Sequence, residues 1–261
     1  MTLALKILLS PVCVVAVSLI GRRWGLAVAG LLGGLPVVAG PILLVETLQH
    51  GRGFGATAAA GTLLGLVALT AFVVVYGRTA KTAGPIRCVL VGWTAFLLAV
   101  AVLDRVHPPA GLSLLLVGAC FALGLRLLPI PRSLPPALVR PRWWDLPARA
   151  VAALALVLVL TGASAALGPH LSGLLAPFPI ITSVLAVFSH GEFGAERTVI
   201  LLRNFLLGFY GFAAFCFVLA ISLSSLTTAA AFGLGLIAAV AAQATAFFLR
   251  SALGNSRRAI P

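Results

Sequence analysis

Charged residues are scarce in this chain. Only 9% of its 261 residues are Asp, Glu, Lys or Arg, and only 5 of them are acidic. Hydrophobic residues make up 61%, and the mean hydropathy is +1.17. A water-soluble domain of this length cannot cover its surface with so few polar side chains. The composition therefore predicts an all-α integral membrane protein whose apolar helices contact lipid.

Catalytic and metal-binding motifs are absent from the sequence as well. It contains no HExxH, no Walker loop and no GxSxG, and its 5 acidic residues are too few for paired catalytic carboxylates or a Ca²⁺ or Mg²⁺ site. Four cysteines stand alone in apolar segments, which is typical of buried thiols rather than disulfides or metal ligands: Cys13, Cys88, Cys120 and Cys216. We expect no enzymatic activity, no metal, no cofactor and no ATP hydrolysis, so any transport would be secondary or facilitated.

Basic residues outnumber acidic ones, and the formal net charge is +13. In a soluble protein this excess would favour a nucleic-acid partner. Here the arginines lie between apolar segments, where basic residues set membrane orientation and contact anionic lipids. We therefore expect membrane lipids as partners and no nucleic acid. The excess of Arg over Lys, together with the Ala, Leu and Gly content, is typical of a protein from a GC-rich bacterial genome.

Apolar segments near 20 residues long, the length that crosses a bilayer, recur along the chain. We expect about nine transmembrane helices, with the following bounds: Leu3–Ile20, Trp24–Leu48, Ala56–Tyr76, Ile86–Leu103, Ala110–Leu127, Arg149–Ala166, His170–Ser189, Thr198–Leu223 and Leu226–Leu249. Arg22 and Arg23 follow the first segment instead of preceding it, which predicts a retained span rather than a cleavable signal.

The link at 128–148 is longer than the others and rich in Pro and Arg. Its prolines exclude a helix, and Trp143 and Trp144 favour the headgroup region. The predicted organisation is a first repeat (1–127), a Pro/Arg-rich cytoplasmic linker (128–148), a second repeat (149–250) and a basic cytoplasmic tail (251–261).

Basic residues concentrate in alternate links between the segments. Odd-numbered links and the tail carry Arg22, Arg23, Arg78, Lys81, Arg87, the linker arginines, Arg250, Arg257 and Arg258. Even-numbered links carry only Arg52 and the balanced Asp104–Arg105 pair. Because basic links stay in the cytoplasm, this pattern predicts a periplasmic N-terminus and a cytoplasmic C-terminus.

Two stretches of the chain repeat one pattern. Residues 29–56 read AGLLGGLPVVAGPILLVETLQHGRGFGA, and residues 172–195 read SGLLAPFPIITSVLAVFSHGEFGA. Both run from Gly-Leu-Leu to a proline, Pro36 or Pro179, and then through apolar residues to His-Gly and Phe-Gly-Ala. The second copy is shorter between the proline and the histidine. The repeat predicts two related halves, each with a helix that Gly and Pro interrupt near its middle.

The number of segments predicts how the halves are related. Five segments precede the second half, so its first segment enters the membrane from the opposite side. Segments one to three then match segments six to eight in an inverted-topology repeat, and one of segments four and five has no counterpart. Inverted repeats with interrupted helices recur in secondary transporters, and the interruptions mark the substrate site.

The repeated pattern of a Gly, Ala/Ser-Gly-Leu, Phe/Leu-Pro, an apolar run and a Gly-containing exit resembles the GlpM-like small bacterial inner-membrane proteins. Those proteins have about four spans, so each half of this chain resembles one whole member. The resemblance covers segments two, three, seven and eight. It implies an inner-membrane protein and carries no settled biochemical activity.

The interrupted helices supply the main candidate site. After each break, free backbone N–H groups would begin a new half-helix, whose positive dipole end suits a carboxylate or phosphate. Thr182 and Ser183 would add hydroxyl groups. The alternative is a pair of proline kinks that neighbouring helices repair. The candidate substrate-binding residues are Gly33, Gly34, Pro36, Val37, Val38, Pro177, Pro179, Thr182 and Ser183, with the N–H groups of Ala39, Ile180 and Ile181 beside them.

Arg203 and Asn204 lie several residues inside the eighth segment. A charge at that depth costs about 2.5–3.5 kcal/mol on insertion scales and should face the interior of the bundle. Arg203 could be the counter-charge for an anionic substrate, with Asn204 in a positioning role. Alternatively, Arg203 extends to the cytoplasmic headgroups, because it lies close to Arg197.

Other polar residues are weaker candidates. Glu46 and His50 form an i, i+4 pair that could couple protons, and His190 occupies the matching position of the second copy. The alternative is a pair of interfacial end caps. Gln243 is a lone polar residue that could line a path or join two helices. Gly61 and Gly65 form a small-xxx-small face for helix packing or for a homodimer.

These observations predict a small secondary transporter or exporter of an anionic or zwitterionic solute, bound at the broken helices and moved by alternating access. Two other functions stay open. One is a non-transporting scaffold or accessory subunit of an envelope-polymer system, with a membrane-protein partner. The other is a flippase for a lipid or a polyprenyl phosphate.

Overall fold

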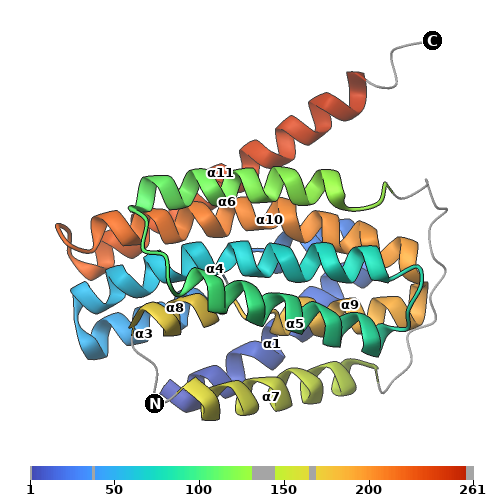
Figure 1. Cartoon of the computed structure of the whole chain (residues 1–261), viewed down its shortest axis with the longest axis horizontal. Helices are drawn as coiled ribbons and strands as arrows, with labels where there is room; N and C mark the ends of the chain where they lie inside the picture. The colour runs from blue at the N-terminus through green and yellow to red at the C-terminus, as the bar shows by residue number, and fades with distance from the viewer. Residues whose placement is uncertain (1, 37–38, 131–144, 165–168, 257–261) are drawn as a thin grey trace.

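The structure, a computed structural model, describes all residues except 1, 37–38, 131–144, 165–168 and 257–261. The described part of the chain forms helices throughout (Figure 1). Their bounds are α1 Thr2–Trp24, α2 Leu26–Gly33, α3 Ala39–His50, α4 Arg52–Thr79, α5 Pro85–Leu103, α6 Ala110–Leu127, α7 Asp145–Ser164, α8 Pro169–Leu175, α9 Ile180–Phe193, α10 Ala195–Ser222 and α11 Thr228–Ser256.

The chain is an all-α membrane protein with several apolar helices. Among the described residues, 6 helices are long and apolar enough to cross a membrane: Arg52–Thr79, Pro85–Leu103, Ala110–Leu127, Gly173–Phe193, Ala195–Ser222 and Thr228–Ala246. The predicted helix breaks are present, because α2 ends at Gly33 before α3 begins, and α8 ends at Leu175 before α9 begins.

Two predicted boundaries are wrong. The second half begins with α7 at Asp145 rather than at Arg149, so the last predicted linker residues are helical. Likewise, α11 extends to Ser256, into the predicted tail. Pro147 lies in the first turn of α7, where a helix tolerates proline, and α11 continues beyond its apolar stretch through Ser251, Asn255 and Ser256. The middle of the linker, with Trp143 and Trp144, lies outside the described residues.

Two long helices form the centre of the bundle. Helices α4 and α10 contain 28 residues each, and they bury 72% and 56% of their most apolar windows. Helices α5, α6 and α11 bury only 28%, 22% and 22% and present Leu, Ile and Val side chains outward. Apolar side chains exposed in this way are stable in lipid, so these three helices form the outer layer.

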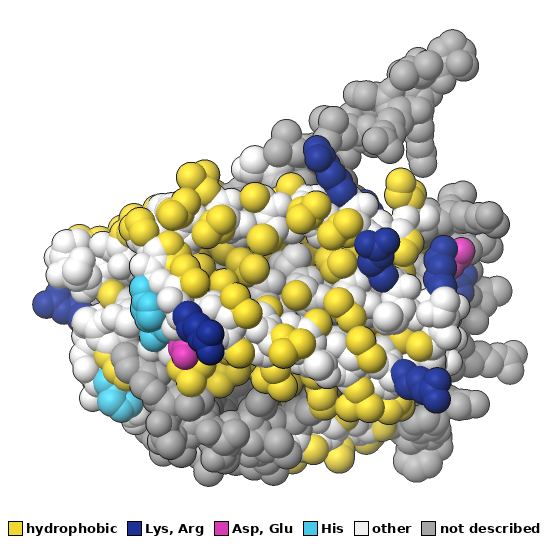
Figure 2. All heavy atoms as spheres, in the orientation of Figure 1, with side chains coloured by type: hydrophobic (Ala, Val, Ile, Leu, Met, Phe, Trp, Pro, Cys, Tyr) yellow, Lys and Arg dark blue, Asp and Glu magenta, His cyan; other side chains and the backbone are white. Residues whose placement is uncertain are grey.

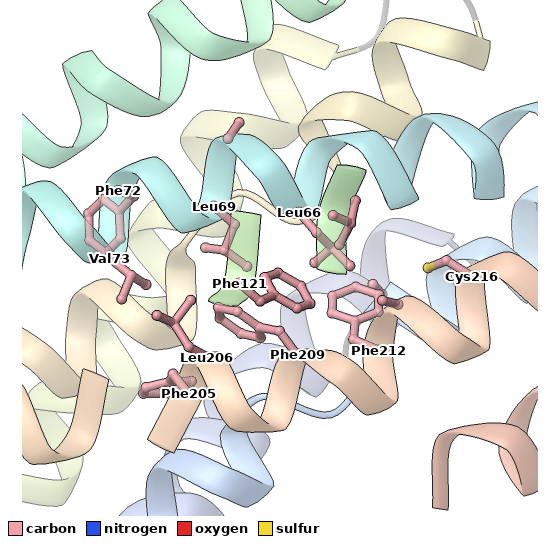
Figure 3. Packing of buried hydrophobic residues seen from close by; sticks show 14 of the residues in the cluster. Leu66, Leu69, Phe72, Val73, Phe121, Phe205, Leu206, Phe209, Phe212 and Cys216 are labelled. Atoms are coloured by element: carbon pink, nitrogen blue, oxygen red, sulfur yellow. The ribbon is translucent and has the colours of Figure 1, made fainter. Parts of the chain in front are cut away.

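Helices α4 and α10 run antiparallel. Gly77 of α4 lies beside Leu202 near the start of α10, and Gly124 of α6 lies between Thr70 and Leu206. Their shared core is aromatic and aliphatic: Leu66, Leu69 and Val73 of α4 face Leu206, Phe209 and Phe212 of α10, with Phe121 of α6 beside Phe209 (Figure 3).

The broken helices lie against the two central helices. Helix α2 packs on α10, and α8 packs on α4. Glycines allow the close approach: a Cβ added at Gly30 would lie 2.5 Å from the Leu201 carbonyl oxygen, and one at Gly61 would lie 2.6 Å from the His170 carbonyl oxygen. The small-xxx-small face of Gly61 and Gly65 therefore packs within the chain, on α8, as predicted for helix packing.

Helices α1 and α7 pack against each other on one side of the bundle (Figure 1). The helix ends fall into two groups. The basic end holds Arg22, Arg149, Arg203 and the α4–α5 link, and the histidine end holds His50, His107 and His170. In the face shown in Figure 2, histidine side chains gather at the left and most basic side chains lie toward the right.

Candidate functional site

The first break redirects one backbone carbonyl group. Leu35 N–H donates to Leu32 at 3.1 Å rather than to Leu31, its regular i−4 partner. The Leu31 carbonyl oxygen turns toward α10, where a Cβ added at Gly208 would lie 2.5 Å from it. Gly34 packs directly on Gly208, and Gly33 packs on Phe205. Only a glycine at position 208 leaves room for this carbonyl group.

The freed carbonyl receives a hydrogen bond from another helix. The side-chain Nε2 of Gln243, on α11, donates to the Leu31 oxygen at 2.9 Å. The Gln243 Oε1 is buried and has no hydrogen-bond partner among the described residues. A buried acceptor without a donor is costly, so this oxygen can accept a hydrogen bond from a water or a solute at the break. The sequence predicts either a path-lining or a packing role for Gln243. Its Nε2 joins α11 to α2, and its Oε1 stays available at the break.

The second break repeats this arrangement. Phe178 N–H donates to Leu175 at 2.9 Å rather than to Leu174. The Leu174 carbonyl oxygen faces α4, where a Cβ added at Gly65 would lie 2.5 Å away, and Pro177 lies beside the same glycine. The spacing between Gly65 and Gly208 equals that between Leu31 and Leu174. At each break, the carbonyl group that leaves the regular helical pattern therefore faces a glycine of a central helix.

Aromatic residues of α5 cover the second break. The Trp93 Nε1 donates to the Ser183 hydroxyl at 2.9 Å, and the Trp93 and Phe178 ring centroids are 5.7 Å apart. The Phe96 ring lies 5.2 Å from the same Phe178. Ser183 and Thr182 are both buried in the first turn of α9. The predicted hydroxyl groups therefore lie at the break, with an indole N–H that the sequence did not reveal.

The predicted N–H groups of α9 are only partly available. Ile180 N–H donates to the Phe178 carbonyl oxygen at 2.7 Å, so it is engaged within the break. Ile181 packs toward Val14 of α1 and Ala153 of α7. In α3, Gly40 N–H donates to Pro36 at 2.8 Å, which starts the half-helix at the predicted position. Val37 and Val38 lie outside the described residues.

Arg203 does not face a break. Its Nη1 donates to the Leu125 carbonyl oxygen at 2.8 Å and the Leu128 carbonyl oxygen at 3.0 Å, at the C-terminus of α6. A cation there satisfies terminal carbonyls and matches the helix dipole. The prediction of Arg203 as a substrate counter-charge is therefore unsupported by its position, because the residue points to α6 on the side of α10 away from α2.

Asn204, the next residue of α10, faces α2. Its Nδ2 donates to the Ile200 carbonyl oxygen at 2.6 Å, and its Cβ contacts the position of Gly30. It is buried. Asn204 therefore lies one helical turn before Gly208, at the side of the first break, and its positioning role stays a prediction.

The three predicted coupling residues lie apart. Glu46 and His50 are on α3 at the histidine end, where His50 Nδ1 lies 3.2 Å from the Glu46 carbonyl oxygen and its ring stacks on Phe54. His190 is at the basic end, where its Nδ1 lies 3.4 Å from the Tyr76 hydroxyl of α4. No direct contact joins the carboxylate of Glu46 to His190, so the structure does not bring these residues into one site.

The structure also corrects the register of the two copies. Gly51 (φ 91°) and Gly194 (φ 80°) both end the post-break helix in the left-handed region that favours glycine. Their spacing equals that between Pro36 and Pro179, so the copies have equal length. Gly194, rather than Gly191, is the counterpart of Gly51. His190 is therefore not the structural counterpart of His50.

A buried ionic cluster at the basic end was missed in the sequence. Arg22 donates to Asp145, the Arg149 Nε lies 3.0 Å from Asp145 Oδ2, and the Arg149 Nη2 lies 3.1 Å from Glu192 Oε2. The Arg149 guanidinium also lies 4.9 Å above the Phe188 ring. The cluster joins α1, α7 and α9. Asp145 and Arg149 at i, i+4 were the available signal, but the assignment of Asp145 to a linker concealed it.

The described part of the chain contains no group of three or more His, Cys, Asp or Glu side chains that could hold a metal ion. The described cysteines are free thiols: Cys13, Cys88, Cys120 and Cys216.

The chain matches no family model, no curated protein and no solved structure. The resemblance of each half to the GlpM-like proteins stays a prediction.

Proposed function

We propose that this protein is a small secondary transporter or exporter built from two inverted repeats, with its solute site at the two helix breaks. The observation that carries the proposal is the paired geometry of the breaks. Each break lies at the same place in its copy, and each directs a redirected carbonyl at a glycine of a central helix. Interrupted helices at matching positions of inverted repeats are where secondary transporters bind their solutes.

The packing of the other helices supports the inverted repeats. Helix α5 packs on α4 as α11 packs on α10, α3 packs on α4 as α9 packs on α10, and α1 packs on α7. The antiparallel course of α4 and α10 agrees with halves that cross the membrane in opposite directions. Helix α6 contacts both central helices and has no counterpart, so it fits the expected unmatched segment. In this proposal α2–α3 forms one interrupted span and Gly173–Phe193, within α8–α9, forms the other, which gives nine spans in all.

The polar groups at the breaks define the class of solute. The Ser183 and Thr182 hydroxyls offer hydrogen-bond donors at the start of α9, where the helix dipole favours negative charge, and the bond from Trp93 orients Ser183. Gln243 Oε1 offers an acceptor at the other break. Donors at one break and an acceptor at the other suit an anionic or zwitterionic solute. In this proposal neutral groups recognise the solute. Arg203 binds the C-terminal carbonyls of α6 instead.

Alternating access would arise from rocking of one repeat against the other. The Leu31 and Leu174 carbonyls contact glycines, which have no side chain to block a sliding movement. The half-helices can therefore shift along α4 and α10. The chain would act in the inner membrane of a bacterium with its basic end in the cytoplasm, in agreement with the distribution of arginine.

A thermal-stability screen of the purified protein tests the proposal. The ligands are carboxylates, amino acids, phosphorylated metabolites and polyprenyl phosphates, and the variants are Ser183→Ala, Gln243→Leu and the Pro36→Ala/Pro179→Ala pair. A ligand at a hundred times its dissociation constant adds about 2.7 kcal/mol to the stability of the native state. We expect a solute to stabilise the wild type and to lose this effect in the variants.

The control variant is Thr94→Val, because Thr94 is exposed on α5 and bonds only within its own helix. Stabilisation that survives in all three break variants would reject the site. The absence of any hit, together with a stoichiometric membrane-protein partner, would favour a scaffold. A hit restricted to polyprenyl phosphates would favour a flippase.

A further inference from the structure

Two histidines far apart in the sequence meet at the histidine end. His107 follows α5 in the link to α6, and His170 is the second residue of α8. Their ring centroids are 4.1 Å apart, and the ring planes differ by 30°. His107 is exposed, whereas His170 is half-buried. The pair joins the α5–α6 link to the half-helix that leads into the second break.

The Nε2 of His170 is a buried atom without a hydrogen-bond partner among the described residues. The ring lies against the backbone of Leu103, which favours a proton on the imidazole. An imidazole in this position can take up a proton at Nε2, where no acceptor among the described residues forms a hydrogen bond with the charged ring. A second cation on His107, at 4.1 Å, would repel it.

Few other charges face His170. Helix α8 packs on α4 and α5. The face of α4 beneath α8 consists of Ala58, Gly61 and Gly65, which do not titrate. Arg52, at the start of α4, donates instead to the Leu226 carbonyl oxygen at 2.9 Å.

On the side of α5, the charged groups are Asp104 and Arg105, both exposed at the end of the helix. Asp104 attracts a proton to His170, and His107 opposes it. The proton affinity of His170 is therefore set by the Asp104 carboxylate, by the His107 imidazole and by burial of the ring.

We propose that His107 and His170 form a proton-binding site whose occupation releases the first turn of α8 from the α5–α6 link. A proton from water binds the Nε2 of His170, no other bond forms or breaks, and the charged ring moves toward solvent. Because α8 leads directly into residues 176–179, proton uptake at this site shifts the half-helix at the second break. A role in coupling protons to solute movement rests on the proposed function, whereas proton binding and release of α8 do not.

The direction of the pH effect follows from the surroundings of the ring, which precedes the candidate span Gly173–Phe193. Burial, followed by the charge of His107, lowers the pKa of His170 below its ordinary value of 6.5, while Asp104 and Leu103 oppose this in part. The undocked state therefore binds the proton more tightly than the docked state. Docking of α8 is strongest above pH 6.5 and weakens as the pH falls below that value.

Hydrogen–deuterium exchange of the full-length protein in detergent tests the proposal without a transport assay. We expect deuterium uptake across residues 169–175, corrected for the intrinsic pH dependence of exchange, to rise when the pH falls from about 7.5 to about 5. His170→Gln should lose this rise. The matched control is His50→Gln, because His50 is exposed at the same end and stacks on Phe54, and it should retain the wild-type response.

Histidine NMR of the same samples gives a second measurement, since the chain has only 4 histidines. We expect the pKa of His170 to lie below 6.5 and to move upward in His107→Gln. Equal exchange at both pH values, a lost response in His50→Gln, or a His170 titration that ignores His107 would overturn the proposal. If His170→Gln does not fold, the His107→Gln titration decides alone. Transport that fails while the pH response of α8 persists would reject the proposed function and leave the proton site standing.

Discussion

At the scale of single residues, the positions that matter most have no side chain. Gly65 and Gly208 each receive a backbone carbonyl from the opposite copy, at a place where an added Cβ would lie 2.5 Å from an oxygen atom. Backbone cannot move aside as a flexible side chain can. These glycines therefore fix the distance between the central helices and the broken helices, and they explain why small residues recur in the interior of an apolar helix.

Gly208→Ala should destabilise the protein, because the new methyl group meets the Leu31 carbonyl. The expected loss is about 1–3 kcal/mol, as for other overpacked sites. Thermal unfolding in detergent measures it. Gly118→Ala in α6 is the matched control, because a Cβ there meets nothing within 4 Å, and the gain in helix propensity should stabilise it by about 0.5–1 kcal/mol. A Gly208→Ala protein as stable as Gly118→Ala would show that the break does not rest on this glycine.

Arg203 illustrates how far sequence reasoning reaches for a single residue. An arginine inside an apolar segment predicts an interior role, and the residue is indeed partly buried. Its partner could not be predicted, because the carbonyls of Leu125 and Leu128 come from a helix that precedes the linker. Backbone carbonyl acceptors leave no signature in a sequence.

Arg203→Ala should weaken the attachment of α6 without removing ligand binding at the breaks. Loss of hydrogen bonds from a charged donor costs about 1.5–3 kcal/mol. Thermal unfolding and exchange near residues 125–128 measure the effect. If Arg203→Ala instead abolishes ligand stabilisation and leaves α6 protected, the arginine serves the solute as a counter-charge after all.

At the scale of elements, α9 is held firmly at its C-terminal end. Glu192 bonds to Arg149 of α7, His190 approaches Tyr76 of α4, and the Thr198 hydroxyl of α10 donates to Ser189 at 3.3 Å. Its N-terminal end follows the break, with one direct side-chain bond to Trp93. Movement of the second break is therefore expected at the α8 side, where the histidine pair lies, rather than at the basic end.

Asp145→Asn should be costly, because Asp145 is 6% exposed and neutralises Arg149, which is equally buried. Removing one partner of a buried pair destabilises a protein by about 3–5 kcal/mol. Asp104→Asn, measured at a pH where the histidines are neutral, is the matched control, since an exposed carboxylate contributes at most about 1 kcal/mol. Equal unfolding temperatures for the two variants would mean that the ionic cluster does not hold α1, α7 and α9 together.

Much of the element pattern could be predicted from the sequence, because hydropathy and prolines are local signals. The breaks at Pro36 and Pro179 are present where the repeat placed them. The register of the copies was wrong because two His-Gly pairs look alike, whereas the chain turns where a glycine adopts positive φ, at Gly51 and Gly194. Long-range pairs such as His107 with His170 depend on the packing of α8, which no local pattern contains.

At the scale of the whole molecule, the proposed transport mechanism requires two halves of opposite orientation. The pairing of helices and the antiparallel central pair agree with that arrangement. Thr82 follows α4 and Ser225 follows α10, both are exposed, and their spacing equals that between the two prolines. In an inverted repeat these two positions lie on opposite sides of the membrane.

Labelling of single cysteines in intact cells is the most direct measurement of this claim. Thr82→Cys and Ser225→Cys would each be placed in a chain whose four cysteines are replaced by serine or alanine, and treated with a membrane-impermeant maleimide before and after permeabilisation. We predict that Ser225→Cys reacts in intact cells and that Thr82→Cys reacts only after permeabilisation. Reaction of both positions from the same side would contradict the inverted repeats and, with them, the proposed transport mechanism.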